Sequence, residues 1–151
     1  MDWLIVFFAT KLHAIIVAAA LLVFSYAKRS VKLMLFKISL ITLPLAFLVS
    51  RLLSALIYNP RPFVDGHAEQ LIAHMPDNGF PSDHALLVFT IAAIVYSQDK
   101  LVGSVLIGLS VLVGIGRVAA GVHHVIDILG SVLIAFAATY VAVRILRRSK
   151  F

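Results

Sequence analysis

The chain of 151 residues contains no cysteine and few charged side chains. Without cysteine it can form no disulfide, no thiolate nucleophile, and no zinc or iron–sulfur site built on cysteine. Charged residues make up 13% of the sequence, whereas they make up about a quarter of a soluble globular domain. Hydrophobic residues make up 62%, and the mean hydropathy is +1.04. The composition therefore predicts an integral membrane protein with no separate soluble domain.

Long apolar runs indicate how the chain crosses the membrane. A spanning helix needs about 20 apolar residues, so the chain has room for about five of them. We expect an all-α integral membrane fold in which residues 1–151 form a single bundle of about five transmembrane helices. The expected spans are residues 3–26, 31–58, 84–97, 101–120 and 125–145. The polar stretch 59–82 is expected to form an outer loop or a surface helix and not a span.

The basic residues predict the orientation of this bundle. Five spans would place the 28–37 turn, the 98–100 turn and the C-terminus on one side of the membrane. The basic residues there are Lys28, Arg29, Lys32, Lys37, Lys100, Arg147, Arg148 and Lys150. By the positive-inside rule this side is cytoplasmic, and the N-terminus lies outside. Because the positive charge lies at helix ends, the net charge of +6 does not indicate nucleic-acid binding.

Polar residues gather in three short segments that this topology places on the outer side. The segments are Asn59-Pro60-Arg61-Pro62, Pro81-Ser82-Asp83-His84, and the stretch from Arg117 through His123 to Asp127. A charge within the apolar region costs several kcal/mol unless it faces a partner in the bundle. Either each arginine extends to the lipid headgroups, or Arg51, Arg61 and Arg117 converge on an anion. A guanidinium binds phosphate oxygens in pairs and keeps its charge, which favours phosphate.

The Pro81 to His84 segment is typical of a helix start. Serine is a good N-cap, so Ser82 would leave the backbone N–H groups of Asp83 and His84 pointing outward. The start of a helix binds anions readily. A capped helix without a ligand is the alternative, and the expected position opposite Arg61 and Arg117 favours an anion site.

His123 and Asp127 are four residues apart, which places both on one face of a helix. The carboxylate can then accept a hydrogen bond from one imidazole nitrogen and leave the other free to act as a nucleophile. A metal site on His84, His123, His124 and Asp127 is a competing interpretation. We favour it less because neighbouring arginines would repel a cation. A buried His–Asp pair with a purely structural role is the third.

Taken together, the three segments resemble the signature of the type 2 phosphatidic acid phosphatase family. These are lipid phosphate phosphatases that share a fold with vanadium haloperoxidases. Arg61-Pro62 matches the end of the first motif, and residues 81–84 match Pro-Ser-x-His. Arg117, His123 and Asp127 match the third motif, Arg-x5-His-x3-Asp.

The resemblance implies a role for each matched residue. His123 would form a phosphohistidine, Asp127 would orient it, and His84 would act as general acid and then as general base. Arg61, Arg117, Ser82 and the backbone of residues 82–84 would bind the phosphoryl oxygens, with no metal or other cofactor.

Two positions differ from the family pattern. Ser54 stands where the family has a lysine, and Arg51, one helical turn earlier, would substitute for it. Gly116 stands where the family often has a serine.

The substrate class also follows from resemblance. The aspartate of Pro-Ser-Asp-His and the preceding residues 74–80 look like the bacitracin-resistance branch, which hydrolyses undecaprenyl diphosphate outside the bacterial cytoplasmic (inner) membrane. Phosphatidylglycerophosphate or phosphatidate is the alternative substrate, so the partners are membrane lipids and a lipid phosphate. A small transporter or a scaffold subunit is the alternative of another class. A transporter would carry charge through its depth, whereas here only Lys11 and His13 lie away from the two faces.

Overall fold

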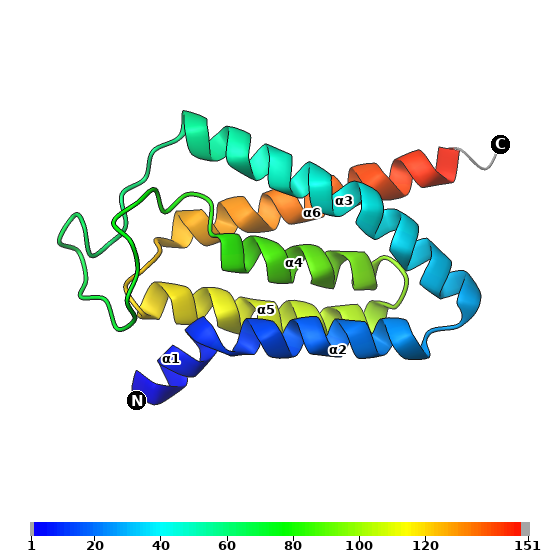
Figure 1. Ribbon diagram of the computed structural model, residues 1–151, viewed down its shortest axis with the longest axis horizontal. Helices are drawn as coiled ribbons and strands as arrows, with labels where there is room; N and C mark the ends of the chain where they lie inside the picture. Colours follow the sequence, from blue (N-terminus) through cyan, green and yellow to red (C-terminus); the bar gives the residue numbers. More distant parts are fainter. Residues whose placement is uncertain (1, 149–151) are drawn as a thin grey trace.

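The computed structural model describes residues 2–148, which form six α-helices joined by loops and turns (Figure 1). The helices are α1 (Asp2–Thr10), α2 (Leu12–Tyr26), α3 (Arg29–Leu56), α4 (Asp83–Tyr96), α5 (Lys100–Ala119) and α6 (Val125–Arg148). The described residues contain one isolated β-bridge, between Pro60 and Asn78, and no strand. The prediction of an all-α fold is confirmed. Lys150, used above for the orientation, lies outside the described residues.

The helices only partly match the five expected spans. Helices α3, α5 and α6 are long and apolar enough to cross a membrane. The expected span 3–26 is instead a helix pair, α1 and α2, which bends by 45° at Lys11 and passes the same test only as a pair. Helix α4 has 14 residues, or about 21 Å at 1.5 Å per residue, and the hydrocarbon core is roughly 30 Å thick. The expected span 84–97 is therefore too short to cross alone, and five full spans are not confirmed.

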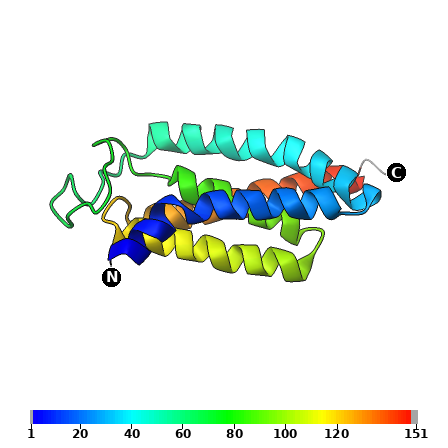
Figure 2. The same cartoon turned by 60° about the horizontal axis from the view of Figure 1, so that its bottom comes forward.

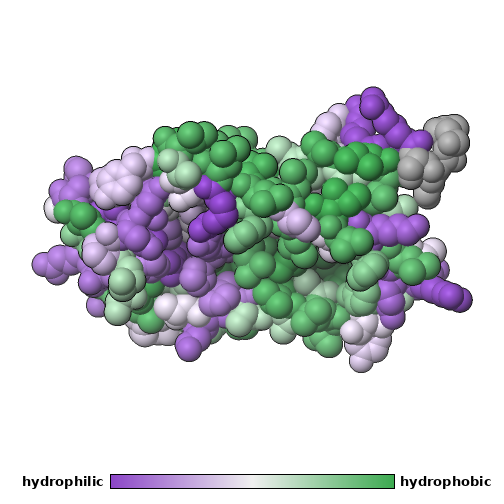
Figure 3. Space-filling view, turned by 45° about the horizontal axis from the view of Figure 1, so that its top comes forward, coloured by the Kyte–Doolittle hydropathy of each residue, from purple (hydrophilic) through white to green (hydrophobic). Residues whose placement is uncertain are grey.

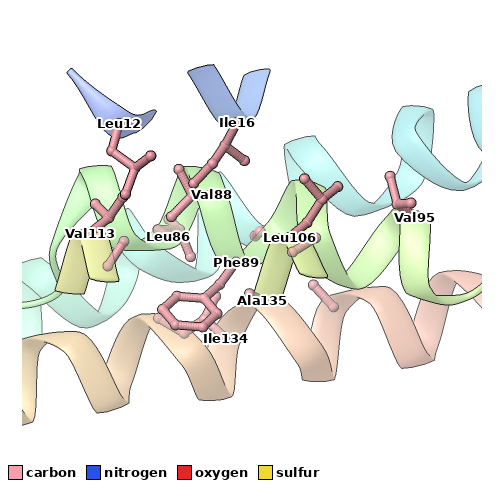
Figure 4. Close-up of a cluster of buried hydrophobic side chains, with 14 residues drawn as sticks. Leu12, Ile16, Leu86, Val88, Phe89, Val95, Leu106, Val113, Ile134 and Ala135 are labelled. Atoms are coloured by element: carbon pink, nitrogen blue, oxygen red, sulfur yellow. The ribbon is translucent and has the colours of Figure 1, made fainter. Parts of the chain in front are cut away.

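Helix α4 forms the centre of the bundle. It packs against α2, α3, α5 and α6, and it lies between α3 and α5 in both ribbon views (Figures 1 and 2). Its side chains fill the largest apolar cluster. Val88 points toward Leu12 and Ile16 of α2, while Phe89 points toward Ile134 of α6 (Figure 4). A short helix can hold this place because its neighbours, rather than lipid, surround it.

On the face of the bundle seen in Figure 3, apolar side chains cover the middle and polar side chains gather toward both ends. Large side chains such as Leu40, Leu48 and Leu133 are exposed on the surfaces of α3 and α6. Large apolar side chains exposed along whole helices are rare on soluble monomers and suit contact with lipid chains. The protein is therefore a membrane protein, as its composition predicts.

The two ends of the bundle hold different segments. One end, which we call the loop end, holds the 57–82 loop, the start of α4 and α6, and the end of α3 and α5 (Figure 1). The opposite end, which we call the basic end, holds the α2–α3 and α4–α5 connections. The three polar segments thus share one end, as expected. That the loop end faces outside stays a prediction.

Candidate active site

The loop end brings together side chains from five parts of the chain. Because α4 and α6 begin there and α5 ends there, residues far apart in the sequence become neighbours. The predicted site residues gathered at this end are Arg61 of the loop, Ser82 and His84 at the start of α4, Arg117 in the last turn of α5, His123 in the α5–α6 connection, and Asp127 in the first turn of α6.

His123 and Asp127 form a buried pair. His123 is 3% exposed and Asp127 is fully buried, and Nδ1 of His123 lies 3.2 Å from Oδ2 of Asp127. The same carboxylate accepts a hydrogen bond from the backbone N–H of His124 at 2.8 Å and from Nδ2 of Asn59 at 2.7 Å. A carboxylate with such donors is an acceptor, so Nδ1 of His123 carries the hydrogen and Nε2 keeps its lone pair.

Two buried guanidinium groups face this free nitrogen. Nη1 of Arg61 lies 3.1 Å from Nε2 of His123, and Nη2 of Arg117 lies 3.4 Å from it. The two arginines are 5% and 2% exposed, so they converge inside the protein and do not extend to the headgroups. Two fixed cations beside one lone pair form a site suited to a dianionic phosphoryl group.

Backbone carbonyls hold both arginines in place. Nη1 of Arg61 donates to the carbonyl of Val122 at 2.7 Å, and Nε donates to Oδ1 of Asp77 at 2.7 Å. Nη1 of Arg117 donates to the carbonyl of Ala9 at 3.4 Å. Nε of Arg117 is buried and has no partner among residues 2–148. A buried donor without a partner costs free energy. A hydrogen bond from this Nε to an oxygen of a bound anion would offset that cost.

The bend between α1 and α2 supplies the carbonyl for Arg117. Because α1 ends at Thr10, the carbonyls of its last turn are available to other donors. Helix α1 also lies very close to α5. A Cβ at Gly116 would lie 2.7 Å from Cβ of Phe8 and 2.8 Å from the nitrogen of Ala9. This close approach accounts for glycine at position 116, where the family often has serine.

Ser82 occupies the N-cap of α4, as predicted, but its side chain makes no capping hydrogen bond. Its hydroxyl is fully buried and has no partner among the described residues. Its backbone is fixed instead, because its N–H donates to the carbonyl of Asp127 at 3.3 Å and its carbonyl accepts from Ser131 Oγ at 2.9 Å. The uncapped N–H groups and the free hydroxyl suit an anion at this helix start.

Arg51 and Asp83 lie outside this centre. They form an ion pair with each other, and their side chains are 44% and 69% exposed. In the part of the chain that the structure describes, neither is hydrogen-bonded to Arg61, Arg117 or His123. The expected substitution of Arg51 for the missing family lysine therefore has no support from these contacts.

Sequence reasoning gave no role to two asparagines that organise the site. Asn59 holds Asp127 from the loop, and no spacing rule connects residues so far apart. Oδ1 of Asn78 accepts from the backbone N–H groups of Asn59 at 2.9 Å and Phe80 at 3.0 Å, while Nδ2 donates to the carbonyl of Ser54 at 2.8 Å. Position 54, where the family has a lysine, thus anchors the loop. The sequence offered one hint of a role for Asn59, which is its position in the polar stretch 59–82.

Electrostatics keeps His123 neutral. Burial lowers the pKa of His123 below its usual 6.5, and the nearby Arg61 and Arg117 lower it further, against the opposing hydrogen bond to Asp127. Burial and Arg61 likewise lower the pKa of His74, whose ring centroid lies 6.2 Å from that of His123. A neutral imidazole with a free lone pair at neutral pH is the form that a nucleophile requires.

The donor set considered for a metal does not come together. Nε2 of His124 lies 3.2 Å from Oδ2 of Asp65 in the loop. Within residues 2–148 no group of three or more His, Asp and Glu side chains is arranged to hold a metal ion. What does come together is a set of arginines around one histidine, which suits an anion.

Comparison with known proteins agrees with this geometry. The model of the PAP2 superfamily matches residues 52–151, which include all three polar segments. The chain is 31% identical over 135 residues to the putative undecaprenyl-diphosphatase YbjG of Escherichia coli, covering 87% of this chain and 68% of that protein. It is 32% identical over 87 residues to the undecaprenyl-diphosphatase BcrC of Bacillus subtilis, covering 58% of this chain and 45% of that protein. The chain thus spans less than half of BcrC.

A solved structure has the same fold. The crystal structure of Aquifex aeolicus LpxE matches with a TM-score of 0.78 and 22% identity, covering 95% of this chain and 87% of that one. At that identity the likeness concerns the fold alone. The match over residues 52–151 shows the family, and the likeness of fold agrees with it. The chain is a membrane protein that belongs to the PAP2 superfamily.

Proposed function

We propose that this protein hydrolyses undecaprenyl diphosphate to undecaprenyl phosphate through a phosphohistidine on His123. One observation carries the proposal. Nε2 of His123 faces the guanidiniums of Arg61 and Arg117, while Nδ1 faces Asp127. This arrangement provides a free nucleophile, a positively charged seat for the phosphoryl group, and a carboxylate that stabilises the imidazolium formed by attack.

The first step transfers the terminal phosphoryl group to the enzyme. Its oxygens bind Arg61, Arg117, the Ser82 hydroxyl and the N–H groups of residues 83–84. Nε2 of His123 forms a bond to phosphorus as the bond to the bridging oxygen breaks, and the bonding electrons leave with the lipid monophosphate. A phosphate leaving group has a second pKa of about 6, so it needs less protonation than the alkoxide of a monoester. Arg51 would have to break its ion pair with Asp83 to reach a phosphate, and we assign it no part in attack.

The second step releases phosphate from His123. His84, at the start of α4, lies within electrostatic reach of both His123 and Arg117. It takes a proton from a water molecule whose oxygen attacks phosphorus as the N–P bond breaks. Inorganic phosphate leaves, His123 regains its neutral form, and His84 releases its proton to the departing phosphate or to solvent.

The relatives named above support the choice of substrate, since one is an undecaprenyl-diphosphatase and another is named as a putative one. The distribution of basic residues supports an orientation with the loop end outside. The bacterial relatives support a bacterial cytoplasmic membrane. A site at the end of the bundle suits a lipid whose charged group lies at the membrane surface.

The substrate is tested by comparing undecaprenyl diphosphate, phosphatidate and phosphatidylglycerophosphate with the purified protein. We expect the highest kcat/KM for undecaprenyl diphosphate. A preference for either glycerophospholipid would overturn the substrate assignment and favour the alternative.

The mechanism is tested separately with His123→Ala. We expect kcat to fall by about 10³-fold or more, and acid-labile phosphate to appear on the wild-type protein but not on the variant. His67→Ala is the matched control, because the His67 side chain is exposed in the loop. Full activity of His123→Ala would refute the mechanism. No hydrolysis by the wild-type protein would instead favour a scaffold or transporter role.

A further inference from the structure

We propose that His13 and His84 form a pair of imidazoles that receives the leaving phosphate of a lipid diphosphate. The inference rests on the proposed function and goes beyond it, because it names the residue that distinguishes a diphosphate from a monoester. His13 lies in the first turn of α2, outside the three polar segments.

The two imidazoles are in direct contact. Their ring centroids lie 4.7 Å apart and their planes are perpendicular. His84 lies in the first turn of the central helix α4, and His13 follows the bend between α1 and α2. The contact places His13 of α2 beside the start of α4. If His84 donates a proton to the bridging oxygen, the leaving phosphate lies next to this pair of imidazoles.

Unpaired polar atoms mark the same place. Among the described residues, five buried side-chain nitrogen or oxygen atoms have no hydrogen-bond partner. Three of them lie at the loop end: Nδ1 of His13, Oγ of Ser82 and Nε of Arg117. Buried polar atoms are nearly always paired in a folded protein. These three polar atoms at the loop end are free to pair with a bound polyanion, Nδ1 of His13 in the tautomer that carries its hydrogen there.

The bend at Lys11 explains how His13 comes to this place. The carbonyl of Ala9, just before the bend, accepts from Arg117, and Arg117 lies within electrostatic reach of His13. The close packing of α1 on Gly116 fixes this part of the chain against α5. The same break in the helix thus supplies a carbonyl for the phosphate-binding arginine and places an imidazole beside His84.

The chemistry separates two substrate classes. In a diphosphate, the bond that breaks leaves a second phosphate with its own charged oxygens, and an N–H of His13 can donate to one of them. In a monoester such as phosphatidate, the leaving oxygen belongs to an alcohol, which gives His13 no phosphate to bind. A contact to the leaving phosphate should therefore favour the diphosphate specifically.

The test uses His13→Phe, which keeps an aromatic ring against His84 and removes both nitrogens, and His13→Asn, which restores a donor. We expect His13→Phe to lower kcat/KM for undecaprenyl diphosphate about tenfold, as for loss of a hydrogen bond to a charged group, with little change for phosphatidate. His13→Asn should recover part of the loss. His67→Phe serves as the control, and the thermal midpoint of each variant in detergent checks that it folds.

A second measurement does not depend on monoester turnover. Inhibition of the same reaction by inorganic pyrophosphate should weaken in His13→Phe, while inhibition by inorganic phosphate should not. An equal fall in kcat/KM on both substrates, or an equal weakening of both inhibitors, would mean that His13 only packs against His84. No change in kcat/KM would rule out a contact between His13 and the leaving phosphate. Failure of the proposed function looks different, because wild type would then not hydrolyse undecaprenyl diphosphate or His123→Ala would remain active.

Discussion

Both ends of the bundle carry positive charge, but in opposite environments. At the loop end, Arg61 and Arg117 are buried and converge on His123. At the basic end the cations are exposed and lie beside tyrosines, with Nζ of Lys100 3.8 Å from the ring centroid of Tyr96 and Nε of Arg144 donating to the hydroxyl of Tyr140 at 2.8 Å. Exposed cations beside aromatic rings are typical of the headgroup region. Burial around a nucleophile, rather than positive charge itself, distinguishes the site.

Removing one arginine from each end gives the largest expected contrast. Arg61→Ala should lower kcat/KM by about 10²–10³-fold, because a preorganised donor to the transferring group is lost. Arg144→Ala, the matched change at the basic end, should alter kcat/KM by less than about twofold, since exposed charges contribute little. Steady-state hydrolysis of undecaprenyl diphosphate in detergent measures both. Equal losses would show that burial does not separate the two ends.

Asn59→Leu tests the hydrogen bonds that hold the nucleophile at the loop end. We expect kcat to fall about tenfold, because Asp127 loses a donor and holds His123 less firmly. KM should change little, since Asn59 donates to Asp127 and not to the phosphate. Asn78→Leu is unsuitable as a control because it would detach the loop from α3. Unchanged kcat would show that His124 and His123 suffice to position the carboxylate.

Gly116→Ser tests whether the buried arginine depends on close helix packing. The hydroxymethyl group would collide with α1, so we expect a loss of about 1–3 kcal/mol in the free energy of unfolding. Activity should also fall, because the carbonyl of Ala9 moves away from Arg117. Gly108→Ser is the control, since a Cβ at Gly108 meets no atom within 4 Å. A stable, fully active Gly116→Ser protein would contradict this account of position 116.

Chelation is expected to have the smallest effect. If arginines alone neutralise the phosphate, EDTA should leave activity unchanged within error. Vanadate should inhibit, since its five-coordinate adducts resemble the transferring phosphoryl group. Loss of activity with EDTA that a divalent ion restores would contradict the proposed mechanism. It would favour the competing interpretation, a metal site at the loop end.

The sequence predicted which polar segments lie together better than it predicted the spans. Hydropathy places α3, α5 and α6 correctly, because each is long and apolar throughout. It gave no sign that Lys11 interrupts the first helix pair, since lysine is a good helix former and the close packing of α1 on Gly116 joins residues far apart in the sequence. It also overestimated α4 as a span, because a helix enclosed by protein and one surrounded by lipid are equally apolar. The ion pair between Arg51 and Asp83 could not be predicted from the sequence either, since it depends on how α3 packs on α4.

Composition and local spacing were enough to predict an all-α membrane protein and to single out the arginine, histidine and aspartate residues that we propose bind phosphate. Both kinds of information depend on residues close together in the chain. The burial of two cations around His123, the hydrogen bond from Asn59 to Asp127 and the contact of His13 with His84 become visible only in the folded protein. Those contacts join residues many positions apart. They exist because a broken helix, a short central helix and one loop meet at the same end of the bundle.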